Sequence, residues 1–311
     1  MSNVGEIISR RPSGAMIENS SRARIAMTSA SDCTVDPAEV AHYEAAAGCW
    51  WDIRSVARWL HRYNLVRVPY IRDAACRQFL RDPGQADCLL GLRVLDIGCG
   101  GGVLCEPLAQ MGATVVGLDP AESAIGVAAR HAQETGVTVD YRCDTADALV
   151  DAGETFDIVL AMEVIEHVAC SGVFLDCCAG LVSPGGLIIL STINRTLKSY
   201  AFAIVMGEYV LRLLPRGSHQ WQKFRSPGEI QSVLEGRAFR VLNISGVIMN
   251  LRSRLLQLSN NSSVNYMLTA ELPGQYQPGF GICHPAVQGQ FGTTCMPAHY
   301  QPGVARWSAG T

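Results

Sequence analysis

The sequence predicts an α/β protein with a parallel, doubly wound sheet, and two observations support this prediction. Between residues 93 and 192, short apolar segments alternate with longer segments of helical periodicity, which is typical of parallel strands joined by crossover helices. A group of glycines follows the first apolar segment, where such a sheet places a ligand-binding loop. The chain has 311 residues, of which 48% are hydrophobic, so it can bury a core of this kind.

The elements of the predicted sheet follow one another without a long gap. Helical segments are expected first, from about residue 37 and again at 69–80. Strands are expected at 93–97, 114–118, 137–141, 156–161 and 186–192, with helices at 103–111, 121–134 and 173–181. Ser226 and Glu229 form a capping box that starts a further helix, which ends at Gly236. Strands at 240–247 and 264–270 then complete a seven-stranded, Rossmann-like sheet.

Three segments lie outside this pattern. Residues 1–35 contain several arginines and serines but few acids, which suits a mitochondrial transit peptide; a disordered leader is the alternative. Residues 194–224 form an insertion after the fifth strand. Residues 272–311 are rich in proline, glycine and glutamine without an apolar period, which predicts a disordered tail. We therefore expect one folded domain at residues 36–271.

Charge and cysteine content narrow the functional classes. The formal net charge is -3, so the chain lacks the overall positive field of proteins that track a nucleic-acid backbone, and we expect no nucleic-acid partner. The 12 cysteines are scattered and form no Cys-x-x-Cys pair. They are interpreted as reduced thiols.

The glycine loop after the first strand indicates the type of ligand. Asp96, Gly98, Gly100 and Gly102 follow the pattern Asp-x-Gly-x-Gly-x-Gly, whose glycines let a ligand lie against backbone N–H groups. A dinucleotide-binding loop would carry a third glycine where Val103 stands. The acid at the strand end would repel a pyrophosphate but attract an ammonium group. The loop therefore favours S-adenosylmethionine over NAD.

Two further acids follow later strands of the predicted sheet. Asp119 ends the second strand, where a carboxylate can accept hydrogen bonds from both ribose hydroxyls. Its alternative role is to cap the helix that begins near Pro120. Asp144 follows the third strand, at the position where such proteins reach an adenine, although an ordinary turn explains it nearly as well.

A cluster of three titratable residues follows the fourth strand. Glu163, Glu166 and His167 lie at the carboxyl end of a central strand, where doubly wound sheets carry their chemistry. Two carboxylates and an imidazole can hold a divalent cation, or His167 can act alone as a general base. A helix start with acids in its first turn is the purely structural alternative.

With these residues assembled, the chain resembles the O-methyltransferases of ubiquinone biosynthesis. The resemblance covers residues 38–270; its most specific segments are Trp50-Trp51-Asp52, Asn64-Leu65-Val66-Arg67 and Val264-Asn265-Tyr266-Met267. It implies cofactor contacts at Arg67, Gly98, Asp119 and Met162, and a magnesium-like ion at Glu163, Glu166 and His167. It also implies methyl transfer from S-adenosylmethionine to a phenolic oxygen of a polyprenylated catechol, namely 3,4-dihydroxy-5-polyprenylbenzoate or 3-demethylubiquinol.

The same resemblance sets expectations for partners and location. We expect peripheral association with the matrix face of the mitochondrial inner membrane and contact with a ubiquinone-biosynthesis protein complex; a cytoplasmic location is the alternative. The insertion carries many apolar residues flanked by Lys198 and Arg212, which predicts a segment lying on a bilayer, with a buried lid as the alternative.

Other functions remain open at this level. A methyltransferase acting on another small phenol or lipid would show the same loop and the same cluster. An oxidoreductase using NAD is opposed by Asp96 and Val103. A cofactor-binding scaffold without catalysis would not need Glu163, Glu166 and His167.

Overall fold

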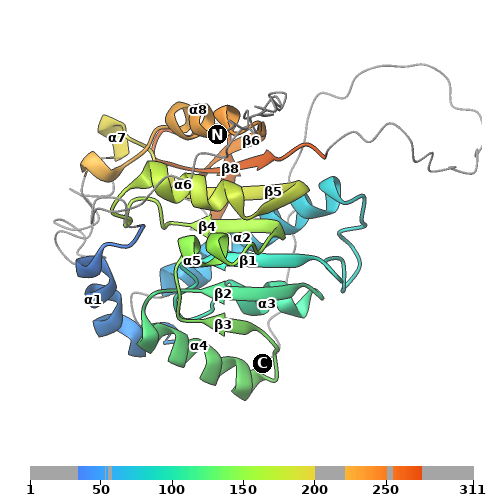
Figure 1. Cartoon of the computed structure of the whole chain (residues 1–311), viewed down its shortest axis with the longest axis vertical. Coiled ribbons are helices and arrows are strands. Elements are labelled where there is room, and N and C mark those ends of the chain that lie inside the picture. The colour runs from blue at the N-terminus through green and yellow to red at the C-terminus, as the bar shows by residue number, and fades with distance from the viewer. Residues whose placement is uncertain (1–33, 53, 55–57, 200–220, 251–254, 275–311) are drawn as a thin grey trace, which may run out of the picture. The chain divides into compact units, whose positions relative to one another are not determined.

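The central element of the fold is an eight-stranded sheet with the strand order β3-β2-β1-β4-β5-β8-β6-β7 (Figure 1). The computed structural model describes residues 34–52, 54, 58–199, 221–250 and 255–274. Neighbouring strands from β3 to β5 are parallel, whereas β8, β6 and β7 pair in antiparallel fashion. The strands span Arg93–Ile97 (β1), Thr114–Leu118 (β2), Asp140–Arg142 (β3), Phe156–Met162 (β4), Val182–Ile193 (β5), Arg240–Met249 (β6), Leu256–Ser259 (β7) and Asn265–Glu271 (β8). The predicted α/β, Rossmann-like fold is confirmed.

Helices cover both faces of this sheet. They span Pro37–Ala46 (α1), Arg58–Gln78 (α2), Cys105–Gln110 (α3), Glu122–Thr135 (α4), Ala146–Asp151 (α5), Ser171–Gly180 (α6), Leu197–Ser199 (α7) and Pro227–Gly236 (α8). One core cluster joins α5, α6 and α8 to the strands, and a second joins α2 and α3 to the opposite face. Alternate residues of β1 belong to different clusters, because successive side chains of a strand point to opposite faces.

The first long helix differs from the prediction. The sequence suggested a break before Pro69, yet α2 runs through this residue without ending. Proline removes the bond to the carbonyl four residues earlier, here that of Leu65, whose side chain is 68% exposed. Water can therefore satisfy that carbonyl, while Val66 and Tyr70 anchor both sides of the proline in the core.

Two strands also differ from the prediction. The third strand begins at Asp140 and not at Val137, because the end of α4 uses the intervening chain: Gly136 adopts φ 71° and Val137 N donates to Ala132 O. The sequence predicted seven strands, and β7 is the additional one that it did not predict. It is short, contains no β-branched residue and pairs only with β6, at the edge of the sheet.

The ends of the chain and the middle of the insertion lie outside the described residues. The expectations for residues 1–33, for the tail from residue 275 and for insertion residues 200–220 therefore stay predictions. The described ends of the insertion are α7 and a 3-10 turn, η4 (Trp221–Lys223). Within the described ranges, no helix has the length and apolar character that crossing a bilayer requires.

Candidate active site

The candidate site lies where the loops after β1 and β4 meet. These two strands are neighbours, and the chain leaves them in opposite directions along the sheet, which creates a crevice at their carboxyl ends. The loops touch: a Cβ atom at Gly98 would lie 2.6 Å from Val164 Cγ2. The glycine loop and the cluster after β4, which the sequence predicted separately, therefore form one region.

The glycine loop requires glycine at three positions for conformational reasons. Gly98, Gly100 and Gly102 adopt φ values of 72°, 52° and 79°, a left-handed region that other residues enter at a cost. The loop is fastened to β2, because Gly98 N donates to Leu118 O at 2.7 Å. Gly100 N donates to Asp119 Oδ2 at 2.9 Å. These bonds fix the backbone conformation of the loop.

Asp119 has a structural role in addition to any contact with a ligand. Its second oxygen, Oδ1, accepts a hydrogen bond from Ala121 N at 2.9 Å, at the start of α4. Burial raises the pKa of Asp119, although the bonds from Ala121 and Gly100 oppose this shift. Each carboxylate oxygen retains a further lone pair, so both roles foreseen from the sequence are compatible.

Asp96 and Arg67 are two buried residues of opposite charge near the glycine loop, and the charge of Arg67 acts on Asp96. Asp96 is 2% exposed and accepts a hydrogen bond from Cys105 Sγ at 3.2 Å; Arg67, on α2, is 5% exposed. Burial raises the pKa of Asp96 to about 7, while Cys105 and the charge of Arg67 limit the shift. The Arg67 guanidinium lies 5.0 Å from the centre of the Tyr63 ring.

Four buried polar atoms around this loop lack a hydrogen-bond partner. They are Trp50 Nε1, Asn64 Oδ1, Arg67 Nε and Tyr141 OH, and they are the buried side-chain atoms without a partner in the described part of the chain. Trp50 lies on Gly100, whose Cβ would come within 2.5 Å of the indole ring. Buried polar atoms are normally paired, so their concentration here indicates a place that a polar ligand completes.

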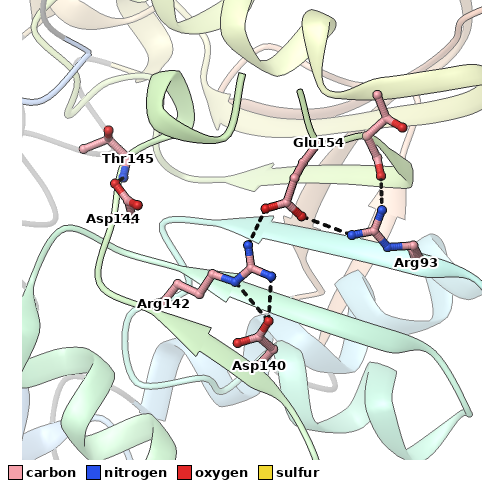
Figure 2. A network of polar contacts seen from close by, with 7 residues as sticks. Arg93, Asp140, Arg142, Asp144, Thr145 and Glu154 are labelled. Carbon is pink, nitrogen blue, oxygen red and sulfur yellow. Dashed lines mark hydrogen bonds and ion pairs between the residues drawn. The ribbon is translucent and has the colours of Figure 1, made fainter. Parts of the chain in front are cut away.

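Asp144 lies on the exposed loop after β3, which an ionic network supports (Figure 2). Glu154 accepts bonds from Arg142 Nη1 at 2.5 Å and from Arg93 Nη2 at 3.1 Å. Arg142 also contacts Asp140 Oδ2 through Nε and Nη2, at 2.9 and 2.7 Å. The network joins both ends of β3 to Glu154, which lies just before β4. It therefore holds the strand that precedes Asp144 in place.

The chain turns sharply after β4. Glu163 has φ 61°, which is uncommon for a residue other than glycine and is found at functional sites. Its backbone N donates to Ser191 Oγ at 3.1 Å, and Ser191 Oγ donates to Glu163 Oε1 at 2.7 Å. Glu166 is 4% exposed and accepts a bond from Thr192 Oγ1 at 2.7 Å. Burial and the charge of Glu163 raise the pKa of Glu166 to about 7, although His167 opposes the shift.

Both ring nitrogens of His167 contact residues of α1. Nδ1 lies 3.0 Å from Glu39 Oε2, and Nε2 lies 3.1 Å from the Tyr43 hydroxyl. A carboxylate only accepts, so the geometry assigns the proton of a neutral ring to Nδ1 and leaves Nε2 as the acceptor. Burial by itself lowers the pKa of His167, but the bond with Glu39 and the charges of Glu166 and Glu163 outweigh it, so the pKa is raised.

The three residues expected to hold a metal are near one another but do not form a ligand set. In the described ranges, no group of three or more His, Cys, Asp or Glu side chains is arranged to hold an ion. The side chains of Glu163 and Glu166 are bonded to Ser191 and Thr192, and His167 uses both nitrogens on α1. As arranged here, these donors do not fit the implied magnesium-like ion.

Comparison with known proteins gives the family. Residues 69–244 match a family described as a methyltransferase domain. The ubiquinone biosynthesis O-methyltransferase of Rhizobium leguminosarum bv. trifolii is 51% identical over 249 residues, which cover 80% of this chain and 99% of the relative. The chain belongs to the ubiquinone biosynthesis O-methyltransferase family. The enzyme of that name from Methylobacterium nodulans is 49% identical, over 79% of this chain and 99% of its own length.

Solved structures show a weaker likeness. Magnesium protoporphyrin IX methyltransferase from Synechocystis, which was crystallised with SAH, is 22% identical, with a TM-score of 0.47 over 73% of this chain and 97% of that chain. Family membership, and not this likeness, makes the chain an S-adenosylmethionine-dependent O-methyltransferase.

Within this family member, the structure brings most of the predicted site residues together. Gly98, Gly100, Asp96, Asp119 and Arg67 belong to the loop or its immediate support. Met162 ends β4 and is 7% exposed, on the core face that carries α2 and α3. Asp144 is separate from this group and is bonded to its own neighbour, since Thr145 N donates to Asp144 Oδ1 at 2.8 Å.

Several site residues of the methyltransferase were missed by sequence reasoning. Glu39 and Tyr43 contact His167 from α1, and Trp50 covers the glycine loop. The Trp50-Trp51 pair was noted as specific to the family, but nothing in the sequence showed that it reaches the loop. Glu39 gave no signal, because an acid in the first turn of a helix is common in any protein.

Proposed function

We propose that this chain transfers the methyl group of S-adenosylmethionine to a phenolic oxygen of a polyprenylated catechol in ubiquinone biosynthesis. The observation that carries the proposal is the closeness of the cofactor loop to His167. The Tyr43 side chain is stacked with Trp50, at 6.4 Å between ring centres, and its hydroxyl contacts His167 Nε2. Trp50 in turn lies on Gly100. The Trp50 and Tyr43 rings together therefore connect the methyl-donor loop with the imidazole of His167.

The residues support a direct transfer. The Tyr43 hydroxyl would move off His167 Nε2 when the substrate binds, and Nε2 would then take the phenolic proton. Glu39 keeps the other nitrogen protonated and the ring in place. The phenolate oxygen attacks the sulfonium methyl, so that a C–O bond forms, the S–CH3 bond breaks and neutral S-adenosylhomocysteine leaves. Most of the acceleration comes from holding donor and acceptor in line.

The substrates that the family resemblance implies are 3,4-dihydroxy-5-polyprenylbenzoate and 3-demethylubiquinol. A panel of acceptors with methyl-labelled S-adenosylmethionine tests this part of the proposal. We expect label in a catechol with a short prenyl chain, less in the same catechol without the chain, and none in the matching monomethyl ether. Equal transfer to prenylated and unprenylated catechols would favour the alternative, a methyltransferase of another small phenol.

The magnesium-like ion that the resemblance implies is tested separately. The resemblance implies an ion at Glu163, Glu166 and His167, and binding would require Glu163 and Glu166 to leave Ser191 and Thr192. We expect metal-free enzyme to retain activity, because His167 acts as the base by itself. Loss of turnover in chelator, with recovery on adding Mg²⁺, would instead support the ion.

We further propose that the enzyme works on the matrix face of the mitochondrial inner membrane, with insertion residues 194–224 on the bilayer and a ubiquinone-biosynthesis protein complex as partner. The support is the apolar composition of this insertion and its basic flanks. Co-sedimentation with anionic liposomes is the test. The full chain is expected to pellet, and a chain without residues 196–221 is expected to stay in solution; equal pelleting would mean that the insertion is only a lid.

A further inference from the structure

Trp51 contacts both the cofactor loop and helix α4, which follows β2 in the chain. Its indole Nε1 donates to the carbonyl oxygen of Gly101 at 2.8 Å. Its ring lies flat on the His131 ring of α4, with 3.4 Å between centres and 5° between planes. The His61 ring packs against the indole at 5.3 Å. The side chain is therefore held in one orientation while it bonds to the loop.

His131 is fixed in turn by a buried acid. Its Nδ1 lies 2.6 Å from Glu106 Oε1, and Thr135 Oγ1 donates to Glu106 Oε2 at 3.2 Å. Glu106 is 3% exposed and lies in the first turn of α3, immediately after the glycine loop. We call Glu106, His131 and Trp51 the brace. Glu106 follows the loop on α3 and contacts His131 of α4. His131 stacks on Trp51, which bonds back to the loop at Gly101.

The brace acts on the peptide between Gly101 and Gly102. Gly100 N is held by Asp119, and Gly102 N donates to Cys99 O at 3.0 Å. The Gly101 carbonyl belongs to the same peptide as Gly102 N and has a glycine on each side, so backbone sterics restrict its rotation weakly. Rotation of this peptide would break the bond from Gly102 N to Cys99 O and change the shape of the loop against which a ligand would lie. The bond from Trp51 opposes this rotation.

We propose that Trp51 is a positioning residue of the cofactor loop, and that stacking on His131, itself anchored to Glu106, holds it in place. The brace sets the affinity for S-adenosylmethionine without touching the reacting atoms. This inference rests on the proposed function, because it assigns the loop to that cofactor. It concerns donor binding alone and requires no statement about the acceptor.

Trp51→Phe is the decisive variant, because phenylalanine removes the N–H group and keeps an aromatic face for His131, although a smaller one than the indole. Calorimetric titration should show S-adenosylmethionine binding about 2- to 10-fold more weakly, the usual effect of one hydrogen bond. The KM for S-adenosylmethionine should rise by a similar factor. We expect kcat at saturating cofactor and the KM of the catechol acceptor to stay within about twofold, which a general loss of folding would not produce.

Trp59→Phe is the matched control. This tryptophan lies at the start of α2, and its described ring contacts are with Arg58 and Arg62, at 5.9 and 4.9 Å, and not with the loop. The same substitution there should leave cofactor affinity unchanged. Thermal unfolding of both variants would show that the measured proteins are folded.

His131→Ala and the double variant test whether the brace acts as a unit. Removing the stacking partner should weaken cofactor binding, and adding Trp51→Phe should then cost little more, because the bond to Gly101 is already compromised. Affinity of Trp51→Phe equal to wild type would overturn the inference, as would equal losses in Trp51→Phe and Trp59→Phe. A folded wild-type chain that does not bind S-adenosylmethionine would overturn the proposed function itself.

Discussion

Asp96 shows how burial of one residue can make cofactor binding depend on pH. Its pKa is raised to about 7, mainly by burial, whereas an unfolded aspartate has a pKa near 3.8. The folded protein therefore binds this proton more tightly than the unfolded chain, so Asp96 favours folding at low pH, and this contribution is lost as the pH rises from about 4 to 7. The ammonium group of S-adenosylmethionine, in contrast, favours the ionised carboxylate.

We predict that the affinity for S-adenosylmethionine rises by roughly tenfold between about pH 5.5 and 7, as Asp96 loses its proton. This window lies below the pKa of roughly 7.7 to 8.0 at which an α-amino group becomes neutral. Titrations at several pH values measure the effect. Asp96→Asn should bind more weakly and without this slope; the same slope in the variant would assign the pH dependence to another group.

The sequence predicted which residues of the sheet loops belong to the site, but it did not predict which side chains contact them. The glycine loop and Asp119 were recognisable because parallel strands present their carboxyl ends on one edge, and the order of strands brings β1 beside β4. The partners of His167 and His131 were not recognisable. Glu39 is 128 positions from His167, and Glu106 is 25 from His131, and such pairs depend on how helices pack and not on local sequence.

Among the elements, strands β1 and β2 match their predicted limits because each is a continuous buried run, with only its first residue exposed. Elements whose limits depend on tertiary contacts were predicted less well. The structure extends α2 through Pro69, since packing of the flanking turns offsets the missing bond. The structure also contains β7, a short edge strand that pairs with β6 alone and contains no β-branched residue.

The capping box of α8 supports a prediction at this scale. Ser226 N and Ser226 Oγ both lie within hydrogen-bond distance of Glu229 Oε2, at 2.8 and 2.7 Å, and Glu229 also pairs with Arg195 at the start of the insertion. Ser226→Ala should therefore lower the free energy of unfolding by about 1 kcal/mol. Chemical denaturation monitors this change.

Ser232→Ala in the same helix provides the comparison. Ser232 is exposed within α8, where alanine has the higher helix propensity, so this variant should be unchanged or slightly more stable. Equal destabilisation of the two variants would show that the capping box contributes nothing specific.

At the scale of the whole molecule, the segment before α2 completes the site that the sheet begins. The sheet supplies the loop and the cluster after β4, while residues 37–52 supply Glu39, Tyr43, Trp50 and Trp51, which contact both. The family resemblance gave the correct domain class from sequence, because part of it, the glycine loop and the cluster after β4, lies at the ends of the sheet strands. It did not show the position of the N-terminal segment, which only the packed structure reveals.

The proposed methyl transfer requires the donor loop and His167 to serve one reaction. Transfer of label from methyl-labelled S-adenosylmethionine to a prenylated catechol, compared between wild type and His167→Asn, tests it most directly. We predict that turnover falls by about 100-fold or more, the usual contribution of a general base, while S-adenosylmethionine affinity stays within about twofold. Wild-type turnover by a folded His167→Asn enzyme would contradict the account.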